Sequence, residues 1–99
     1  MQKNKKGQKI KASQFDNLIG LLIKQKREER QLFTNNSFMQ KDFAEKIGLS
    51  LQQYQKYEHG KSKVPLSMLF KIFDVLEMNE EEKAEFWVKV DKKRNELNK

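Results

Sequence analysis

Four long polar side chains lie close together in the run LQQYQKYE, which begins at Leu51. Gln52, Gln53 and Gln55 carry amides that both donate and accept hydrogen bonds, and Lys56 carries an ammonium group that donates. The edges of bases offer matching acceptors and donors in the major groove of DNA. If this run is a short helix, its polar side chains form an exposed face that could read base edges.

Two short helices joined by a tight turn would hold this face in position. In the first helix Phe43, Ala44 and Ile47 share one face, and the small Ala44 lets a second helix cross closely. Gly48 suits the left-handed residue that follows a helix, because glycine has no Cβ. Ser50 suits the N-cap of the second helix. This order of elements indicates a helix-turn-helix reader of DNA.

The rest of the chain adds three helices and predicts an all-α, five-helix fold. Apolar residues repeat at helical spacing after Ser13, which Asp16 complements as a capping pair, and the helix they predict runs to about Gln31. Pro65 suits the first position of a later helix. The expected parts are a basic disordered arm over 1–12, a helix-turn-helix domain over 13–78, and a C-terminal helix over 79–99 capped by Asn79 and Glu82.

Charge is distributed unevenly along a chain whose formal net charge is +7. Residues 1–32 carry nine Lys or Arg against three acids, residues 33–65 five against three, and residues 66–99 seven against eight. The basic surplus toward the N-terminus favours a polyanionic partner for one face and a different contact for the other. The lysine-rich segment 1–12 suits either a solvated tail or an arm that becomes ordered along DNA phosphates.

Catalytic and metal chemistry have little support in the sequence. The 99 residues suit one small domain, and the absence of cysteine excludes disulfides and thiolate metal sites. His59 is the only histidine, so neither a metal site nor a nucleophile–base pair can be assembled around it. Glu80, Glu81 and Glu82 are better explained by the start of a helix. We therefore expect no enzyme, cofactor or metal and, with no apolar run of membrane-spanning length, a cytoplasmic protein.

Three parts of the sequence match the pattern of a known family, both in their residues and in the spacing between those residues. They are Gln40-x-x-Phe43-Ala44-x-x-Ile47-Gly48-Leu49-Ser50, Tyr54-x-x-Tyr57-Glu58-x-Gly60-Lys61 and Pro65-x-x-x-Leu69. Over roughly residues 15–78 the chain resembles the XRE, Cro and phage-repressor type of helix-turn-helix protein. It departs from that pattern at Met39, where Ser or Thr is usual, and in a longer preceding connection, where Ser37 could cap the helix one turn earlier. Phe33 and Phe38 are expected to anchor this connection to the core.

This resemblance implies roles for individual polar residues. The helix over 50–59 would lie in the major groove, with base contacts at Leu51, Gln52 and Lys56 and secondary ones at Gln53 and Gln55. Phosphate contacts would come from Gln40, Lys61 and Lys63. In the family an arginine of the covering helix pairs with the glutamate that ends the reader helix, and the matching residues are Arg27 and Glu58. The implied function is a transcriptional repressor of a palindromic operator in double-stranded DNA.

The C-terminal helix carries more apolar residues than one face can bury. Phe86, Trp87 and Val90 are therefore candidates for contact with a second copy of the chain, since helix-turn-helix proteins commonly read paired half-sites. The alternative is that Ala84 and Trp87 pack on the core while Phe86 and Val90 stay partly exposed. Two other functions stay open: an antitoxin whose C-terminal helix grips a small protein partner, and an adapter that uses this fold only to bind protein.

Overall fold

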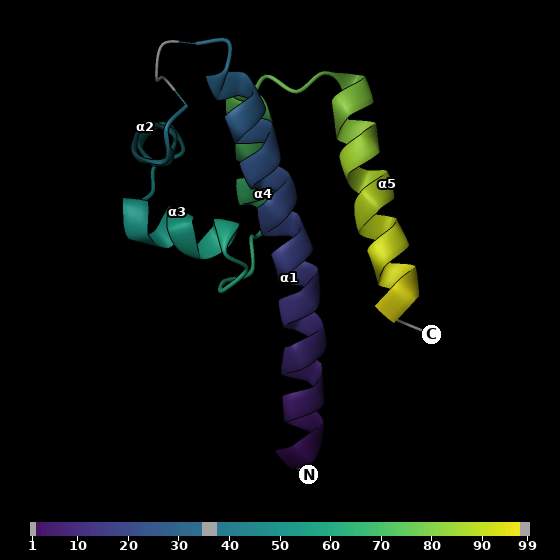
Figure 1. Cartoon of the computed structure of the whole chain (residues 1–99). Coiled ribbons are helices and arrows are strands. Elements are labelled where there is room, and N and C mark those ends of the chain that lie inside the picture. The colour runs from purple at the N-terminus through teal and green to yellow at the C-terminus, as the bar shows by residue number, and fades with distance from the viewer. Residues whose placement is uncertain (1, 35–37, 98–99) are drawn as a thin grey trace.

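The computed structural model describes residues 2–34 and 38–97, with side chains from residue 14 onward. It contains five helices and, within those ranges, no strand: α1 (Gln2–Gln31), α2 (Gln40–Lys46), α3 (Leu51–Glu58), α4 (Leu66–Val75) and α5 (Glu80–Leu97). Figure 1 shows α1 as a long central rod, with α2 and α3 on one side of it and α5 on the other. The all-α, five-helix fold predicted from the sequence is confirmed.

Helix α1 is longer than the sequence pattern indicated. We expected a helix that starts near Ser13 after a disordered arm, but the backbone is helical from Gln2 to Gln31. No proline interrupts this stretch, and Lys, Gln and Ala are good helix formers. Once the packed part has formed, each added residue gains a hydrogen bond without a new nucleation step. The expected start at Ser13, with Asp16 as capping partner, is therefore wrong, because both residues lie inside the helix.

One apolar core joins all five helices. Its largest fully buried side chains are Tyr54, Phe43, Ile23, Ile47, Ile72 and Leu76. Phe43 of α2 and Tyr54 of α3 meet edge to face with their ring centroids 5.2 Å apart, an arrangement that aromatic pairs favour. Phe73 of α4 meets Phe86 of α5 in the same way at 5.0 Å. The core thus fixes the two reader helices on one side of α1 and α5 on the other.

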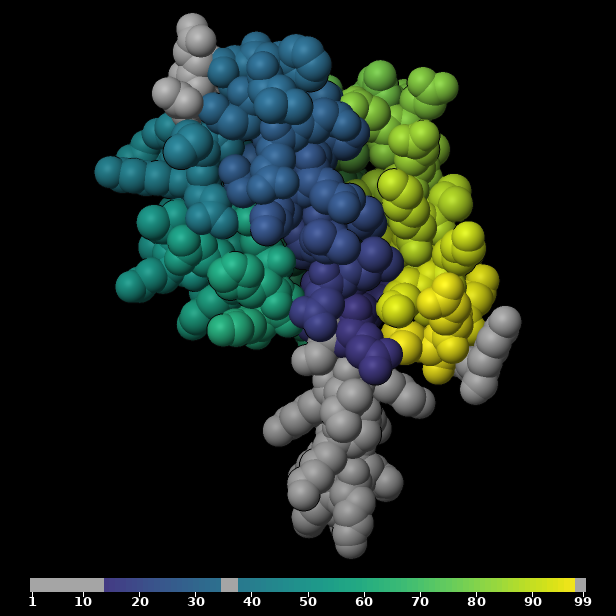
Figure 2. All heavy atoms as spheres, in the orientation of Figure 1, coloured from purple at the N-terminus to yellow at the C-terminus, as the bar shows by residue number. Residues whose placement is uncertain are grey.

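Helix α5 turns a different face inward from the one we expected. Phe86 and Val90 are only 6% and 8% exposed, so both belong to the protein's own core. Ala84 is exposed, and Trp87 lies at the edge of the core with 38% of its surface exposed. The alternative in which Ala84 packs on the core while Phe86 and Val90 stay exposed is therefore wrong, and of the three residues expected to contact a partner only Trp87 is exposed. The long α1 supplies an extended surface for α5, whose side chains close against it in Figure 2.

The two phenylalanines that flank the connection from α1 to α2 behave differently. Phe38 packs against the core as expected, but Phe33 is 82% exposed and anchors nothing. The predicted cap at Ser37 lies outside the described residues, and Met39, the residue before α2, makes no side-chain capping bond. Pro65 is also the residue before its helix, with an extended ψ of 149°, rather than the first helical residue. Its missing N–H costs nothing there, because that position lacks a helical partner.

Three helices end in the same way. The residue after the C-cap is left-handed in each: Gly48 after α2 (φ 78°), Gly60 after α3 (φ 71°) and Glu77 after α4 (φ 53°). The following N–H then donates back across the last turn, from Leu49 to Ala44, from Lys61 to Lys56 and from Met78 to Phe73. The ending at Gly48 confirms the sequence prediction, and Gly60 ends α3 in the same way. Glu77 adopts a conformation that is costly for a residue with a Cβ.

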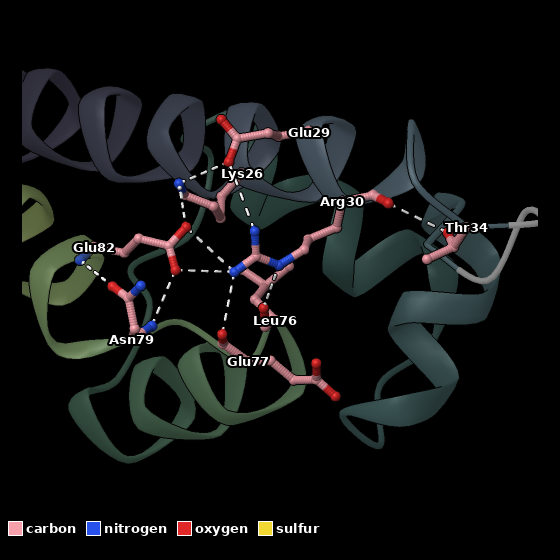
Figure 3. A network of polar contacts seen from close by, with 8 residues as sticks. All are labelled: Lys26, Glu29, Arg30, Thr34, Leu76, Glu77, Asn79 and Glu82. Carbon is pink, nitrogen blue, oxygen red and sulfur yellow. Dashed lines mark hydrogen bonds and ion pairs between the residues drawn. The ribbon is translucent and has the colours of Figure 1, made fainter.

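Arg30 of α1 binds the end of α4 and the start of α5 together. Its Nε donates to the Leu76 carbonyl oxygen at 2.6 Å and its Nη2 to the Glu77 carbonyl oxygen at 3.1 Å. The same Nη2 contacts both carboxylate oxygens of Glu82, at 3.0 and 3.2 Å, and Lys26 Nζ reaches that carboxylate at 3.0 Å. Figure 3 shows these groups converging on Glu82. The network ties α5 to α1 at the surface.

Helix α5 begins with the capping box that the sequence predicts. Asn79 Oδ1 accepts from the Glu82 backbone N–H at 2.8 Å, and Glu82 Oε1 accepts from the Asn79 backbone N–H at 3.0 Å. The Asn79 bond contributes most to lowering the pKa of Glu82 to about 2; partial burial opposes it, and Lys26 and Arg30 reinforce it. Glu82 is therefore ionised at neutral pH.

Candidate nucleic-acid interface

Helix α3 is seated directly on α1 at its C-terminal end. A Cβ added at Gly20 would lie 2.2 Å from the Tyr57 carbonyl oxygen and 2.7 Å from the Glu58 carbonyl oxygen. A Cβ at Gly60, which already has a positive φ, would lie 2.7 Å from the Cα of Asn17. Only glycine permits approaches this close. The two glycines therefore set the distance between the covering helix and the reader helix.

A buried ion pair holds α3 at this distance. Arg27 Nε donates to Glu58 Oε2 at 2.6 Å and Nη2 donates to Oε1 at 3.2 Å, and the two side chains are 7% and 0% exposed. Arg27 Nη1 donates to the Phe38 carbonyl oxygen at 3.0 Å. The Glu58 carboxylate also accepts from the Tyr54 hydroxyl and, at 2.8 Å, from the Gln40 amide. Arg27 and Glu58 are the pair that the resemblance predicts, and Phe38, Tyr54 and Gln40 are three further partners. We call the Arg27–Glu58 pair with these partners the clamp.

The Arg27–Glu58 pair of the clamp is ionised, and its buried polar atoms have hydrogen-bond partners. Burial by itself would raise the pKa of Glu58, but hydrogen bonds from Arg27, Tyr54 and Gln40 outweigh burial and lower that pKa. Burial and the neighbouring Glu58 raise the pKa of the Tyr54 hydroxyl, which stays protonated as a donor. No buried side-chain polar atom in the described part of the chain lacks a partner. A buried charge pair persists only when its atoms are satisfied in this way, and here it serves to position α3.

The opposite side of α3 is open to solvent. Ser50 Oγ caps the helix by accepting from the Gln53 backbone N–H at 3.1 Å, as predicted. Leu51, Gln52 and Lys56 are exposed, whereas the side chains of Gln53 and Gln55 are half-buried. The five residues assigned to base contacts therefore divide into three on the outer face and two at its margins.

Gln40 joins the two reader helices, which the sequence did not reveal. Its Oε1 accepts from Gln55 Nε2 at 3.1 Å, while its own Nε2 donates to Glu58 Oε1 at 2.8 Å. A primary amide carries two N–H groups, so within the described residues this bond to Glu58 uses one of them. The orientation of Gln55 is thus set by α2 and, through it, by the clamp. One sequence signal pointed to this network: Tyr54 has the buried spacing of a core residue but carries a hydroxyl that needs a partner.

Two lysines follow the C-terminus of α3. Lys61 and Lys63 are exposed in the loop before α4, directly after the turn at Gly60. Burial raises the pKa of the Asp16 carboxyl on α1, and the charge of Lys63 partly offsets that rise. His59 is the C-cap residue of α3 and is exposed. The exposed side of α3 therefore continues into a basic edge.

The described ranges contain neither a cluster of metal ligands nor a membrane-spanning helix. No group of three or more His, Cys, Asp or Glu side chains within residues 14–34 and 38–97 could hold a metal ion. None of the helices described is both long enough and apolar enough to cross a bilayer. The features that stand out are those of a polar helix face on a rigid support.

A family model described as helix-turn-helix matches residues 23–83. The match contains α2, α3 and α4, the part of α1 that carries Arg27, and the start of α5. It includes every residue assigned to a base, phosphate or clamp contact. No curated protein and no solved structure matches the chain. Because the match covers more than half of the sequence and the fold agrees with it, the chain belongs to the XRE family of helix-turn-helix proteins and is a DNA-binding transcription regulator of that type.

Proposed function

We propose that this protein is a repressor that binds a palindromic operator as a homodimer, with α3 in the major groove of double-stranded DNA. The observation that carries the proposal is the exposed row of Leu51, Gln52 and Lys56 on a helix whose other side is locked by a buried ion pair. Base contacts require side chains held in register, and a rigid support supplies that register.

Each exposed residue of α3 suits one kind of base contact. The Gln52 amide matches N7 and N6 of adenine, and the Lys56 ammonium can reach O6 and N7 of guanine. Leu51 can pack on the methyl group of thymine. Gln53 and Gln55 have secondary roles, and Gln55 is held in place by Gln40. Sequence choice therefore rests mainly on the outer three residues.

Phosphate contacts would position the domain on the duplex. Lys61 and Lys63 lie beyond the end of α3, and Gln40 lies at the start of α2, where its Nε2 donates to Glu58 Oε1. Such contacts fix orientation and supply affinity that falls as salt rises, but they carry no sequence information.

Selection of bound duplexes from a random library tests this proposal. The expected outcome is an enriched palindrome whose half-sites lie about 10 base pairs apart. Gln52→Ala should then lose about 1–3 kcal/mol of binding on the selected site and little on random DNA. Lys63→Ala should weaken binding to both and reduce the slope of affinity against salt.

Gln25→Ala is a matched control, because Gln25 is an exposed glutamine of α1, a helix to which we assign no base contact. Its sequence preference should equal that of the unmodified protein. If Gln52→Ala kept its full preference, the base contacts would lie elsewhere. If no sequence were enriched at all, α3 would not read DNA and a protein-binding role would replace the repressor.

A further inference from the structure

A hollow of about 170 Å³ lies between α1 and α5. In Figure 1, α5 is on the side of α1 away from the reader helix, so the hollow is separate from the exposed face of α3. Its apolar lining comes from α1, from the connection after α4 and from α5, and consists of Leu22, Ile23, Leu76, Met78 and Phe86. Water finds few hydrogen-bond partners on such a lining. The inner part of the hollow therefore suits an apolar group.

The charged side chains that line the hollow fall into two sets. Lys26 Nζ binds Glu29 at 2.9 Å and Glu82 at 3.0 Å, and Figure 3 shows these three side chains pointing toward one another. Glu85 and Lys89 of α5 are exposed, and neither makes a hydrogen bond or ion pair within the described residues. The first set is neutralised inside the protein, whereas the second offers one carboxylate and one ammonium group to a ligand.

The spacing of the second set suits a ligand with two opposite charges close together. Glu85 and Lys89 are four residues apart, so their side chains are neighbours on one side of α5. The Glu85 carboxylate favours an ammonium group, and the Lys89 ammonium favours a carboxylate. A free α-amino acid carries both groups on one carbon atom, from which its side chain also leaves. We propose that the hollow binds a free α-amino acid with an apolar side chain.

Charge separates this ligand from simpler apolar molecules. A carboxylate without an ammonium group would leave Glu85 facing a like charge, and an amine without a carboxylate would do the same to Lys89. The zwitterion matches both, and its charged end stays at the exposed edge of the hollow, where Glu85 and Lys89 lie. The charged rim thus selects the class of ligand, while the lining receives its side chain.

Volume limits the size of that side chain. An engineered protein cavity of about 150 Å³ lined by Leu, Ile and Phe holds benzene. The hollow, at about 170 Å³, is of similar size. It therefore suits a branched aliphatic side chain or a single aromatic ring, as in leucine or phenylalanine. Such a ligand would contact α1 and α5 at once, so binding should also raise the melting temperature. None of these steps depends on DNA reading, so the inference goes beyond the proposed function.

Calorimetric titration of the full chain with leucine tests the site, with phenylalanine as a second probe. We expect saturable binding at one site. Isocaproate is leucine without the ammonium group, and isoamylamine is leucine without the carboxylate. Each should bind at least about tenfold more weakly than leucine, because one charged contact is lost. Alanine keeps both charges but lacks the larger apolar side chain, so it should also bind more weakly.

Two variants assign the charged contacts. Glu85→Gln should bring leucine close to isocaproate in affinity, because the ammonium group then has no partner. Lys89→Gln should likewise bring leucine close to isoamylamine. Both residues are exposed and make no contact that the fold needs, so circular dichroism and melting without ligand should be unchanged. Glu81→Gln, at an exposed glutamate of α5 that does not line the hollow, is the matched control and should bind leucine normally.

Three results would overturn the site. The first is no saturable binding of leucine or phenylalanine at millimolar concentration. The second is leucine binding that neither Glu85→Gln nor Lys89→Gln weakens, which would place the amino acid elsewhere on the protein. The third is equal affinity for leucine and a singly charged analogue, which would show that the hollow selects apolar molecules without regard to the zwitterion.

Discussion

Two arginines of α1, less than one turn apart, hold the two sides of the molecule in different ways. Arg27 reaches Glu58 of α3 in the interior, where the side chains are 7% and 0% exposed. Arg30 reaches Glu82 of α5 near the surface, where they are 24% and 20% exposed. Each guanidinium also binds a backbone carbonyl oxygen, that of Phe38 or that of Leu76. The chemical groups are the same, and their burial differs.

Burial changes what each pair does. A pair removed from water must be fully satisfied and holds one geometry, and the loss of one partner strands the other charge. A pair at the surface is screened by water and salt and contributes little by itself. The reader helix is thus fixed rigidly to α1, whereas α5 depends mainly on apolar packing by Phe86 and Val90. The helix that we propose reads DNA is therefore the one whose position on α1 is held more rigidly.

The largest effect should come from breaking the buried pair. Glu58→Ala should destabilise the protein by about 3–5 kcal/mol, because Arg27 would stay buried without its counter-ion. Urea unfolding followed by circular dichroism measures the change. Glu45→Ala, at an exposed glutamate of α2, is a control that should shift stability little. Equal effects of the two variants would show that the clamp contributes no more than a surface charge.

A smaller but still large loss is expected at the α1–α3 contact. Gly20→Ala puts a methyl group 2.2 Å from the Tyr57 carbonyl oxygen, a backbone atom that cannot move aside alone. We expect a loss of about 1–3 kcal/mol despite the better helix propensity of alanine. Thermal melting measures it, with exposed Leu21→Ala as the neighbouring control. A stabilised Gly20→Ala protein would mean that the helices are not in close contact.

The surface network should respond to pH. Glu82 has a folded pKa of about 2 against an ordinary value of 4.5, so the unfolded chain binds more protons between these values. Its contribution is complete above about pH 4.5 and disappears as the pH falls toward 2. Glu82→Gln should cost about 1 kcal/mol at neutral pH and should flatten the fall in stability across this window. Urea unfolding at a series of pH values tests this, and an unchanged slope would contradict it.

The smallest effect should be a gain at the end of α4. Glu77 is left-handed where α2 and α3 end in glycine, and no described contact holds its side chain. Glu77→Gly keeps the backbone carbonyl that Arg30 binds and removes the Cβ strain. We expect a stabilisation of about 0.5–1 kcal/mol, seen as a higher melting temperature. A lower melting temperature would show that the position is not strained.

Local features of the fold could be predicted where a single residue determines a backbone state. Gly48 and Gly60 end their helices, Ser50 caps α3, and Asn79 with Glu82 forms a reciprocal box, all as the sequence indicates. The prediction was wrong where the start of a helix depended on how far the helix extends beyond its packed part, as at Ser13 of α1. The outward position of Gln52 and Lys56 on α3 followed from helical spacing, but the link from Gln40 to Gln55 required knowledge of how α2 meets α3.

By itself, the sequence determined the helical class, the two-helix reader with its polar face, and the family pattern, because capping, glycine turns and helical period act within a few neighbouring residues. Only the tertiary structure decided that Phe86 and Val90 face inward, that Trp87 and Val88 stay partly exposed, and that Arg27 is buried while Arg30 is not. Helical period tells which residues share a face but not how the helix is rotated against its neighbours. That rotation is set by packing between residues far apart in the chain.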